Sequence, residues 1–417
     1  MLKSFIKINL LVMIISNLVN FSNYIIMMLL GRFLSPADYG IYNSVCSIGV
    51  ILSFFSPVFY NVSMKFVIKY QDNRSAQWEL IKYLGKWVSY IGGAFSFTLI
   101  LLAPVFSRYL KLGTVTPLII FIFTIFSVLE LTFRSGILNA FYEYVNVNIQ
   151  IFINAMIRLS LCILFVAVLG FSYNMAIAAA LISNIVTVFL MTGTINSKFS
   201  DLDRSGDYKI TLEEVREILF FSVPVLLMNL SVYVITNLDI ITVKHLFSPE
   251  EAGIYSGASV VGRIAFFLPQ MVINVLFSEI VKNSQNNESS MNIILLILSL
   301  TTVASGSVAA VAYFFPEEIL SLLLGKTFAT AAIYLPTITA AMAVASVINV
   351  LFIVCLAKSI YGFLVPTYIC LSVMIVGIYF FCDDSPLMVA QGMLCGGLAI
   401  FFINYGLLIF SLIRKKI

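Results

Sequence analysis

The sequence predicts an all-α integral membrane protein with about twelve transmembrane helices, built as two parallel six-helix repeats. Of its 417 residues, 61% are hydrophobic and only 11% are charged. Soluble domains average roughly 25% charged residues, so this chain lacks the polar side chains that would cover a surface in water. Lipid is the solvent that fits this composition.

Apolar runs of membrane-spanning length recur along the chain, with short polar segments between them. A helix needs roughly 20 apolar residues to cross the hydrocarbon core of a bilayer. The runs lie at residues 8–30, 41–62, 83–105, 114–133, 148–169, 174–196, 215–243, 254–280, 291–314, 328–356, 361–381 and 387–411. An even number of spans places both termini on the same side of the membrane.

The distribution of Lys and Arg predicts which side that is. With a cytoplasmic N-terminus and alternating sides, seventeen of the 24 Lys and Arg residues fall in cytoplasmic segments. Five fall in outer segments, namely Arg32, Arg108, Lys111, Lys244 and Lys326, and the spans hold Arg158 and Arg263. Because cytoplasmic loops carry an excess of Lys and Arg, we expect both termini in the cytoplasm of a multi-pass protein.

The most polar segment of the chain bisects it. Residues 198–216 read KFSDLDRSGDYKITLEEVR, a solvated connector between the sixth and seventh runs. We therefore predict an N-terminal six-helix lobe at residues 1–200, a cytoplasmic linker at 201–216 and a C-terminal six-helix lobe at 217–417.

An internal repeat supports this division. Shifting the chain by 213 positions aligns residues 35–69 with residues 248–282, and 11 of the 35 aligned positions are identical, including Ser-Pro and Gly-Ile-Tyr. The copies are separated by an even number of spans, so they share one orientation across the bilayer. Parallel repeats of this kind occur in transporters, where the substrate path lies between the halves. We expect two lobes around a central cavity; a duplication without transport is the alternative.

Ionisable residues inside the predicted spans are the first candidates for function, because each costs roughly 2.5–3.5 kcal/mol on insertion scales. Arg263 lies about ten residues into its run, near mid-membrane, and its repeat equivalent is Val50. We predict that Arg263 contacts an anionic substrate in the central cavity, unless it forms an internal ion pair with Asp239. Asp239 either pairs with Arg263 or carries a coupling proton.

Two further charged residues lie on neighbouring spans. Arg158 is predicted to be a second phosphate contact or a partner of Glu130. Glu130 and Arg134 are four residues apart, which favours a local pair on one helix face. Among the uncharged residues, Pro57, Pro224 and Pro269 can kink their spans, and Tyr42 and Tyr255 are expected to anchor helices near the outer interface.

Several classes of chemistry are disfavoured. The single histidine, His245, and the scattered cysteines offer no metal site, and we expect no metal and no cofactor. A Walker-type phosphate loop is absent from the sequence, and the predicted outer loops are too short for a catalytic domain. We therefore expect a protein that is not an enzyme. Movement of a substrate across the membrane would be driven by a gradient or by substrate flux.

Ordered sequence motifs resemble those of a known family. The segment LSPADYGIY at residues 34–42 is similar to a turn that follows the first span in that family, and residues 221–255 are similar to its Phe-Ser-x-Pro start of span seven, late Asp and following Ser-Pro turn. Together they resemble the polysaccharide-unit flippases of the Wzx type, in the multidrug/oligosaccharidyl-lipid/polysaccharide exporter superfamily. The resemblance covers essentially the whole chain.

The resemblance implies a specific activity. Such proteins move undecaprenyl-pyrophosphate-linked oligosaccharide, an O-antigen or related repeat unit, to the outer leaflet of the bacterial inner membrane. Spans one, two, seven and eight line a central, often cationic cavity, which assigns Arg263, Asp239, Lys244 and Arg32 to that cavity. The implied partners are the lipid-linked oligosaccharide and membrane lipid, with polysaccharide polymerase and chain-length proteins as further candidates and no nucleic acid.

Other functions remain open at this point. A drug/cation antiporter of the same superfamily would call for an acidic cavity, whereas cations are at least as prominent here. A lipid-linked peptidoglycan precursor flippase usually has two extra spans. A membrane polysaccharide polymerase or ligase usually has a large outer loop, and a lipid-binding scaffold would not transport at all.

Overall fold

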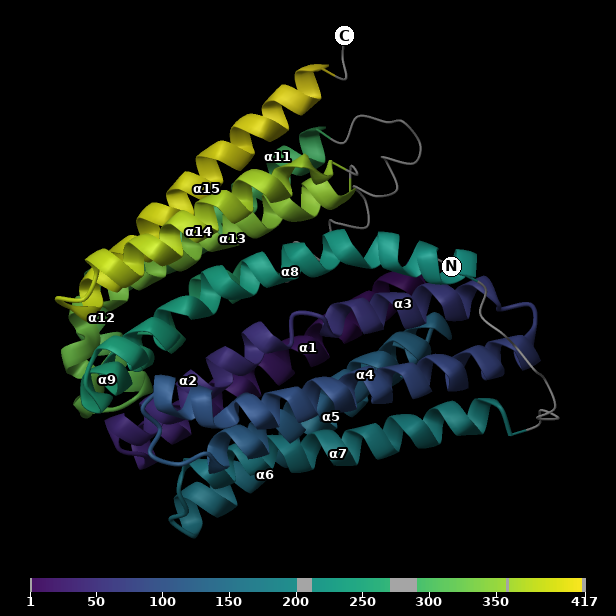
Figure 1. Cartoon of the computed structure of the whole chain (residues 1–417), viewed down its shortest axis with the longest axis horizontal. Coiled ribbons are helices and arrows are strands. Elements are labelled where there is room, and N and C mark those ends of the chain that lie inside the picture. Colours follow the sequence, from purple (N-terminus) through teal and green to yellow (C-terminus); the bar gives the residue numbers. More distant parts are fainter. Residues whose placement is uncertain (1, 201–211, 271–290, 358–359, 415–417) are drawn as a thin grey trace. The chain divides into compact units, whose positions relative to one another are not determined.

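The computed structural model describes residues 2–200, 212–270, 291–357 and 360–414, and within them every regular element is a helix (Figure 1). Within these described residues, eleven helices are long and apolar enough to cross a membrane, and α2 (Pro36–Leu52) with α3 (Ser56–Lys69) forms a twelfth, bent span. The all-helical fold class and the span count predicted from the sequence are confirmed.

The chain divides into two compact units. Unit 1 comprises Met1–Leu34 and Leu52–Leu226, and unit 2 comprises Ser35–Ile51 and Leu227–Ile417. Most of α2 therefore packs with C-terminal helices, a division that differs from lobes at residues 1–200 and 217–417. Residues 201–211 of the predicted linker at 201–216 lie outside the described residues. The lobe boundaries stay a prediction.

Unit 1 is a helical bundle in which α5 packs against α3, α4 and α7. Its helices are α1 (Leu2–Phe33), α3, α4 (Arg74–Tyr109), α5 (Thr116–Ala140), α6 (Tyr144–Cys162), the π-helical η1 (Ile163–Val168), α7 (Tyr173–Lys198) and the first part of α8 (Leu212–Leu246). Buried apolar side chains such as Phe66, Leu80 and Phe133 join α3, α4 and α5 into one core.

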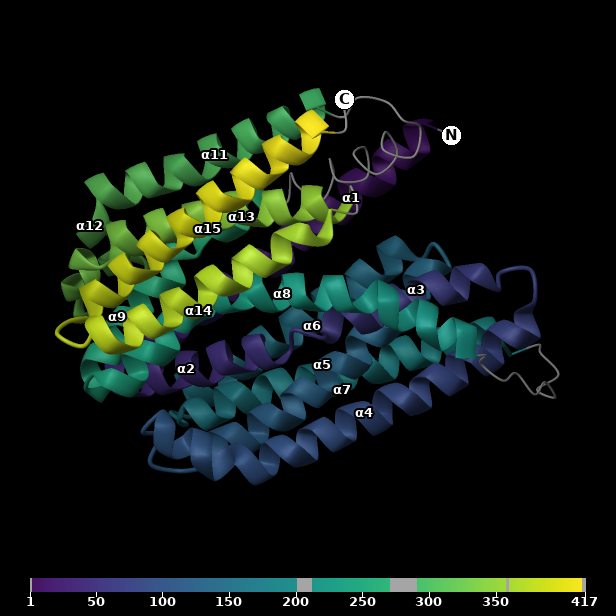
Figure 2. The ribbon, with the colours of Figure 1, turned by 45° about the horizontal axis from the view of Figure 1, so that its top comes forward.

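Unit 2 is a second bundle, in which α13 packs against α9, α11 and α15 (Figure 2). Its elements are most of α2, the second part of α8, α9 (Pro249–Gly262), α11 (Met291–Phe314), α12 (Pro316–Leu323), η2 (Lys326–Ile333), α13 (Leu335–Ala357), η3 (Tyr361–Phe363), α14 (Leu364–Phe381) and α15 (Pro386–Arg414).

The predicted effect of proline on helix geometry differs between Pro57 and Pro224. The helix axis bends by 41° between α2 and α3, and Pro57 stands in the first turn of α3. Proline lacks the backbone N–H that would continue the hydrogen-bond ladder, which accounts for the break there. Pro224, in contrast, lies inside the continuous helix α8.

The starts of α2 and α9 repeat the same local structure. The Ser35 hydroxyl donates to Asp38 at 2.9 Å and accepts from its backbone N–H, and Ser248 and Glu251 form a complete capping box. The helices meet at equivalent glycines: a Cβ on Gly253 would lie 1.8 Å from the Pro36 carbonyl oxygen. These matching starts support the predicted repeat, whose second copy is described as far as residue 270.

Candidate functional site

A buried polar cluster joins α8, α9 and α2 within unit 2. Asp239 accepts hydrogen bonds from Ser259 at 2.6 Å and Tyr255 at 3.4 Å, and its other carboxylate oxygen lies 3.5 Å from Nη2 of Arg263. The same Nη2 lies 3.4 Å from the Ser47 hydroxyl of α2. We call these five residues the Asp239 cluster.

The spacing of the α9 residues explains how the cluster forms. Tyr255, Ser259 and Arg263 are four residues apart, which places them along one helix face. Ser259 also accepts the backbone N–H of Arg263 at its carbonyl oxygen, 3.0 Å away, at the point where α9 ends. One stripe of α9, together with its C-cap residue Arg263, therefore brings three polar side chains to Asp239.

The carboxylate and the guanidinium of this cluster differ in their exposure and in how many of their hydrogen-bonding groups have partners. The Asp239 side chain is only 2% exposed and accepts from three groups, whereas the Arg263 side chain is 14% exposed. Both polar contacts of Arg263 use one terminal nitrogen at long range, and its buried Nε has no hydrogen-bond partner among the described residues. A guanidinium has five N–H donors, so Arg263 retains donors for another acceptor.

The ion-pair alternative predicted for Arg263 and Asp239 is therefore present, and it leaves N–H donors of Arg263 without a hydrogen-bond partner among the described residues. The planar fork of arginine suits the oxygens of phosphate, and the partly exposed guanidinium offers unused N–H groups of that fork. The arrangement can bind an oxyanion.

Lys244 lies on the same helix as Asp239 but not on the same face. It is five residues farther along α8, which rotates its side chain roughly 140° about the helix axis. Its side chain is buried, with 1% exposure. Sequence reasoning grouped Lys244 with Arg263, whereas the helix geometry assigns it to a different side of α8.

The remaining predicted site residues lie in unit 1. Arg158 of α6 donates to the Asn23 side chain of α1. Glu130 instead takes Arg134 as its partner and accepts from Ser89 at 2.6 Å. Glu130 is thus paired with Arg134 within α5, while Arg158, for which a phosphate contact or a pair with Glu130 was expected, has Asn23 as its hydrogen-bond partner.

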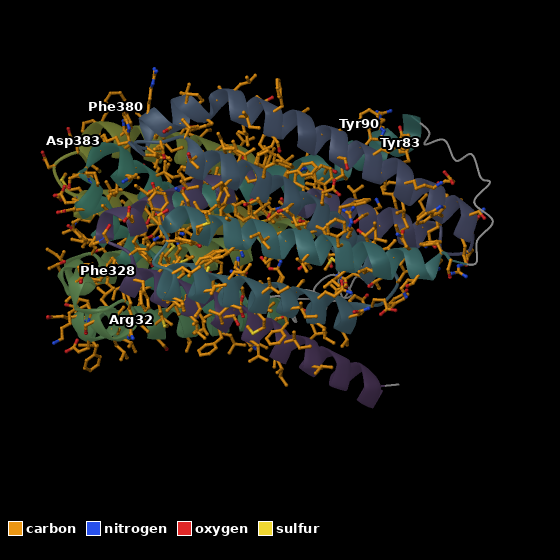
Figure 3. All side chains as sticks on the ribbon, turned by 90° about the horizontal axis from the view of Figure 1, so that it is seen from below. Arg32, Tyr83, Tyr90, Phe328, Phe380 and Asp383 are labelled. Atoms are coloured by element: carbon orange, nitrogen blue, oxygen red, sulfur yellow. The ribbon has the colours of Figure 1, made fainter. Side chains whose placement is uncertain are left out.

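Arg32 is exposed in the last turn of α1. In Figure 3 it lies near one end of unit 1, while Tyr83 and Tyr90 of α4 lie toward the other end. Among the described residues, no group of three or more His, Cys, Asp or Glu side chains is placed to hold a metal ion.

The chain was compared with models of known protein families. A model of the family described as polysaccharide biosynthesis protein matches residues 6–281, about two thirds of the chain. The chain belongs to this polysaccharide biosynthesis family. No curated protein sequence matches it closely enough to define a relative.

Solved structures of other proteins share the fold of this chain. An inward-facing multidrug resistance transporter of the MATE family in the MOP superfamily is similar, with a TM-score of 0.75, 12% identity and coverage of 95% of this chain and 96% of that chain. The lipid II flippase MurJ, in an inward closed conformation, gives a TM-score of 0.69 at 14% identity, covering 95% and 87%.

A third similar structure is a MOP superfamily transporter from Pyrococcus furiosus, described as having a binding pocket of reverse polarity that suggests a different function. Its TM-score is 0.63 at 13% identity, with 97% of this chain and 95% of that chain covered. The polysaccharide biosynthesis protein thus has the two-lobed, all-helical fold shared by MATE transporters and MurJ.

Sequence reasoning missed three members of the Asp239 cluster. Tyr255 was assigned to the outer interface, but its side chain is fully buried and bonds Asp239. Nothing in the sequence distinguishes Ser259 and Ser47, because single serines are common in spans. The four-residue spacing from Tyr255 through Ser259 to Arg263 was the available signal.

Proposed function

We propose that this polysaccharide biosynthesis protein is a flippase for lipid-linked oligosaccharides. Its substrate is an undecaprenyl-pyrophosphate-linked repeat unit of O-antigen or a related surface polysaccharide. It moves this unit from the cytoplasmic to the outer leaflet of the bacterial inner membrane, with both termini in the cytoplasm. The family match and the fold shared with a lipid II flippase support this class of substrate.

The proposal rests on one observation, which is that Arg263 has N–H donors without a hydrogen-bond partner among the described residues. An arginine deep in a membrane span is costly unless it faces a partner or a cavity. Here its partner, Asp239, is already bonded by Ser259 and Tyr255, and the guanidinium keeps buried and unused donors. The diphosphate of the substrate is an anion that these donors fit.

The two-lobed fold supports alternating access as the mechanism. Binding of the diphosphate at Arg263 positions the head of the substrate, and rocking of the lobes exposes it to the opposite leaflet. Arg32, Lys244 and Arg158 are proposed as further cationic contacts along that path, and Asp239 or Glu130 as the group that couples transport to an ion. The chain acts as a transporter and not as an enzyme.

The proposal is tested by genetic complementation in the native host. The chain is deleted, and surface polysaccharide and cytoplasm-facing lipid-linked repeat units are both measured. We expect loss of surface polymer with build-up of the inner-leaflet intermediate, rescue by the wild type, and no rescue by Arg263→Ala at matched expression. Arg108→Ala is the matched control, because Arg108 is an exposed arginine at the end of α4.

A double variant separates substrate contact from ion pairing. If Arg263 serves only to neutralise Asp239, export fails in Arg263→Gln and returns in Arg263→Gln combined with Asp239→Asn. If Arg263 contacts the diphosphate, the double variant stays inactive. Unchanged surface polymer after deletion, in a host without a second flippase, contradicts the proposal and favours a drug antiporter; translocated but unpolymerised units favour a polymerase.

A further inference from the structure

The outward face of helix α1, in unit 1, has two chemically different halves. An α-helix turns by about 100° per residue, so Asn17, Asn20 and Tyr24 fall within about 60° of one another around its axis. Asn20 is exposed, and the other two are half-buried. The adjoining half of the face is apolar and exposed, and it consists of Leu11, Ile14, Leu18 and Phe21. We call the half formed by Asn17, Asn20 and Tyr24 the α1 polar arc.

The two amides of the α1 polar arc have unused hydrogen-bonding groups. The Asn20 side chain has no hydrogen-bond partner among the described residues. Asn17 donates one amide hydrogen to the carbonyl oxygen of Met13, one turn earlier on the same side of α1, at 2.9 Å. Because a primary amide has two N–H donors and an acceptor oxygen, both asparagines retain groups that can bond a ligand.

The position of the arc in its span argues against contact with lipid. Residues 11–33 of α1 form a candidate membrane span, and the arc lies near the middle of it. An amide in hydrocarbon loses its hydrogen bonds to water and gains none, which is unfavourable. The apolar half of the same face suits lipid, whereas the polar half suits a hydrated space inside the membrane.

A cation borders the arc. Arg158 of α6 donates to the side chain of Asn23, which is three residues from Asn20 and therefore its neighbour on the helix surface. The buried Nε of Arg158 has no hydrogen-bond partner in the part of the chain that the structure describes. Helices α1 and α6 also meet where Ser16 donates to Asn148 at 3.0 Å. Polar groups thus continue from α6 onto the outward face of α1.

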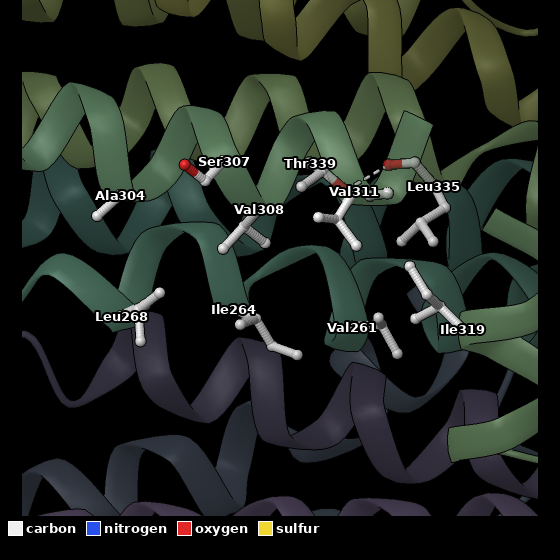
Figure 4. A pocket seen from close by; sticks show the side chains of 11 residues that line it. Val261, Ile264, Leu268, Ala304, Ser307, Val308, Val311, Ile319, Leu335 and Thr339 are labelled. Atoms are coloured by element: carbon white, nitrogen blue, oxygen red, sulfur yellow. Dashed lines mark hydrogen bonds between the residues drawn. The ribbon is translucent and has the colours of Figure 1, made fainter. Parts of the chain in front are cut away.

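The pocket in unit 2 drawn in Figure 4 has the opposite chemistry. Its lining is apolar apart from two hydroxyls, and each of these donates to a carbonyl oxygen of its own helix, Ser307 to Val303 at 2.7 Å and Thr339 to Leu335 at 2.5 Å. A ligand rich in hydroxyls would lose its hydration there without gaining hydrogen bonds. The α1 polar arc, in contrast, offers such a ligand both donors and acceptors.

We propose that the α1 polar arc binds the sugar of the lipid-linked substrate. This inference rests on the proposed flippase function, which supplies a substrate with an oligosaccharide head. Each sugar hydroxyl donates and accepts hydrogen bonds, and the amides of Asn17 and Asn20 match both roles. The ring of Tyr24 adds an apolar surface on which the C–H face of a sugar ring can pack. Membership in a polysaccharide biosynthesis family favours saccharide over other polar occupants.

The test compares two ligands on the full-length protein in detergent. One is the undecaprenyl-pyrophosphate-linked oligosaccharide extracted from the deletion strain, and the other is undecaprenyl diphosphate, which has no sugar. Equilibrium binding of each is measured for the wild type and for Asn17→Leu combined with Asn20→Leu. We expect the double variant to bind the sugar-bearing lipid about tenfold more weakly, because about two hydrogen bonds are lost, and to bind undecaprenyl diphosphate as the wild type does.

Further variants distinguish hydrogen bonding from an effect on folding. Asn20→Gln keeps a primary amide and should retain most of the affinity for the sugar-bearing lipid. Phe21→Leu alters the adjoining apolar half, where Phe21 is 61% exposed, and should bind both ligands as the wild type does. If the double variant does not fold, Asn20→Ala takes its place, with an expected loss of about fivefold for the sugar-bearing lipid alone.

The outcomes separate this inference from the proposed function. Unchanged binding of the sugar-bearing lipid by the arc variants, or equal weakening of both ligands, overturns the assignment of the arc. If Arg263→Ala still weakens both ligands in that case, the flippase function stands and only the arc proposal fails. If the wild type binds neither ligand and deletion leaves surface polymer intact, both are wrong.

Discussion

Neutralising one partner of the Asp239–Arg263 pair should destabilise unit 2 more than neutralising half of an ordinary surface pair. The perturbations are Asp239→Asn, Arg263→Gln and the two combined. Nη2 and Oδ1 are 3.5 Å apart, and the Asp239 side chain is 2% exposed. At an effective dielectric constant of 20, two unit charges at this distance attract by about 5 kcal/mol before desolvation is counted.

The net effect is smaller and unequal for the two charges. Removing one partner of a buried ion pair typically costs about 3–5 kcal/mol. Arg263→Gln should lower the free energy of unfolding by about 3 kcal/mol, because charged hydrogen bonds from Ser259 and Tyr255 still stabilise Asp239. Asp239→Asn should cost a similar amount or less, since Arg263 keeps some exposure to solvent.

The double variant measures the interaction itself. Residues in contact usually show coupling energies of about 0.5–3 kcal/mol. We therefore expect the combined variant to lose about 3–4 kcal/mol rather than the sum of the single losses. For a unit of roughly 200 residues, each kcal/mol shifts Tm by about 2–4 °C, so each single change should lower Tm by about 6–12 °C.

The assay is thermal unfolding of the purified protein in detergent, followed for the wild type and the three variants. Glu130→Gln with Arg134→Gln provides a second pair in unit 1 for comparison, because its members are four residues apart on one helix. Strict additivity of the two single losses at Asp239 and Arg263 would refute the reasoning, since it would mean that the side chains do not interact.

Three further variants test the packing of unit 2 by unfolding in detergent. Gly253→Ala should lower Tm strongly, because its Cβ would lie 1.8 Å from the Pro36 carbonyl oxygen; an unchanged Tm would disprove the close contact. Gly306→Ala meets open space and should raise stability by about 0.5–1 kcal/mol, so a lower Tm would contradict that geometry. Ser259→Ala removes the 2.6 Å bond to Asp239 and should cost about 1.5–3 kcal/mol, with little further loss in an Asp239→Ala background, which has no acceptor.

The sequence predicted the fold well because membrane spans follow from local composition. Each of the twelve predicted runs corresponds to a span in the structure, including the one that bends near Pro57. Apolar length, charge placement and proline effects act within a single segment, so no knowledge of packing was needed. The repeat was visible for the same reason, through identical Ser-Pro and Gly-Ile-Tyr motifs at two helix starts.

The candidate site was predicted only in part because it depends on contacts between helices. Arg263 and Asp239 stood out as charges inside spans, and their pairing was one of two stated alternatives. Tyr255 was misplaced because an aromatic residue near a span end usually marks the interface. Arg158 could be assigned to Glu130 from neighbouring spans, but its actual partner, Asn23, lies on α1, far away in sequence.

Direct measurement of lipid translocation tests the central claim most closely. The purified protein is reconstituted in liposomes that carry an undecaprenyl-pyrophosphate-linked oligosaccharide on one leaflet, and a sugar-cleaving enzyme added outside reports the accessible fraction over time. The account predicts translocation by the wild type and by Arg108→Ala, and none by Arg263→Ala. Failure of the wild-type protein to move this lipid, together with transport of a cationic drug in the same liposomes, would contradict it.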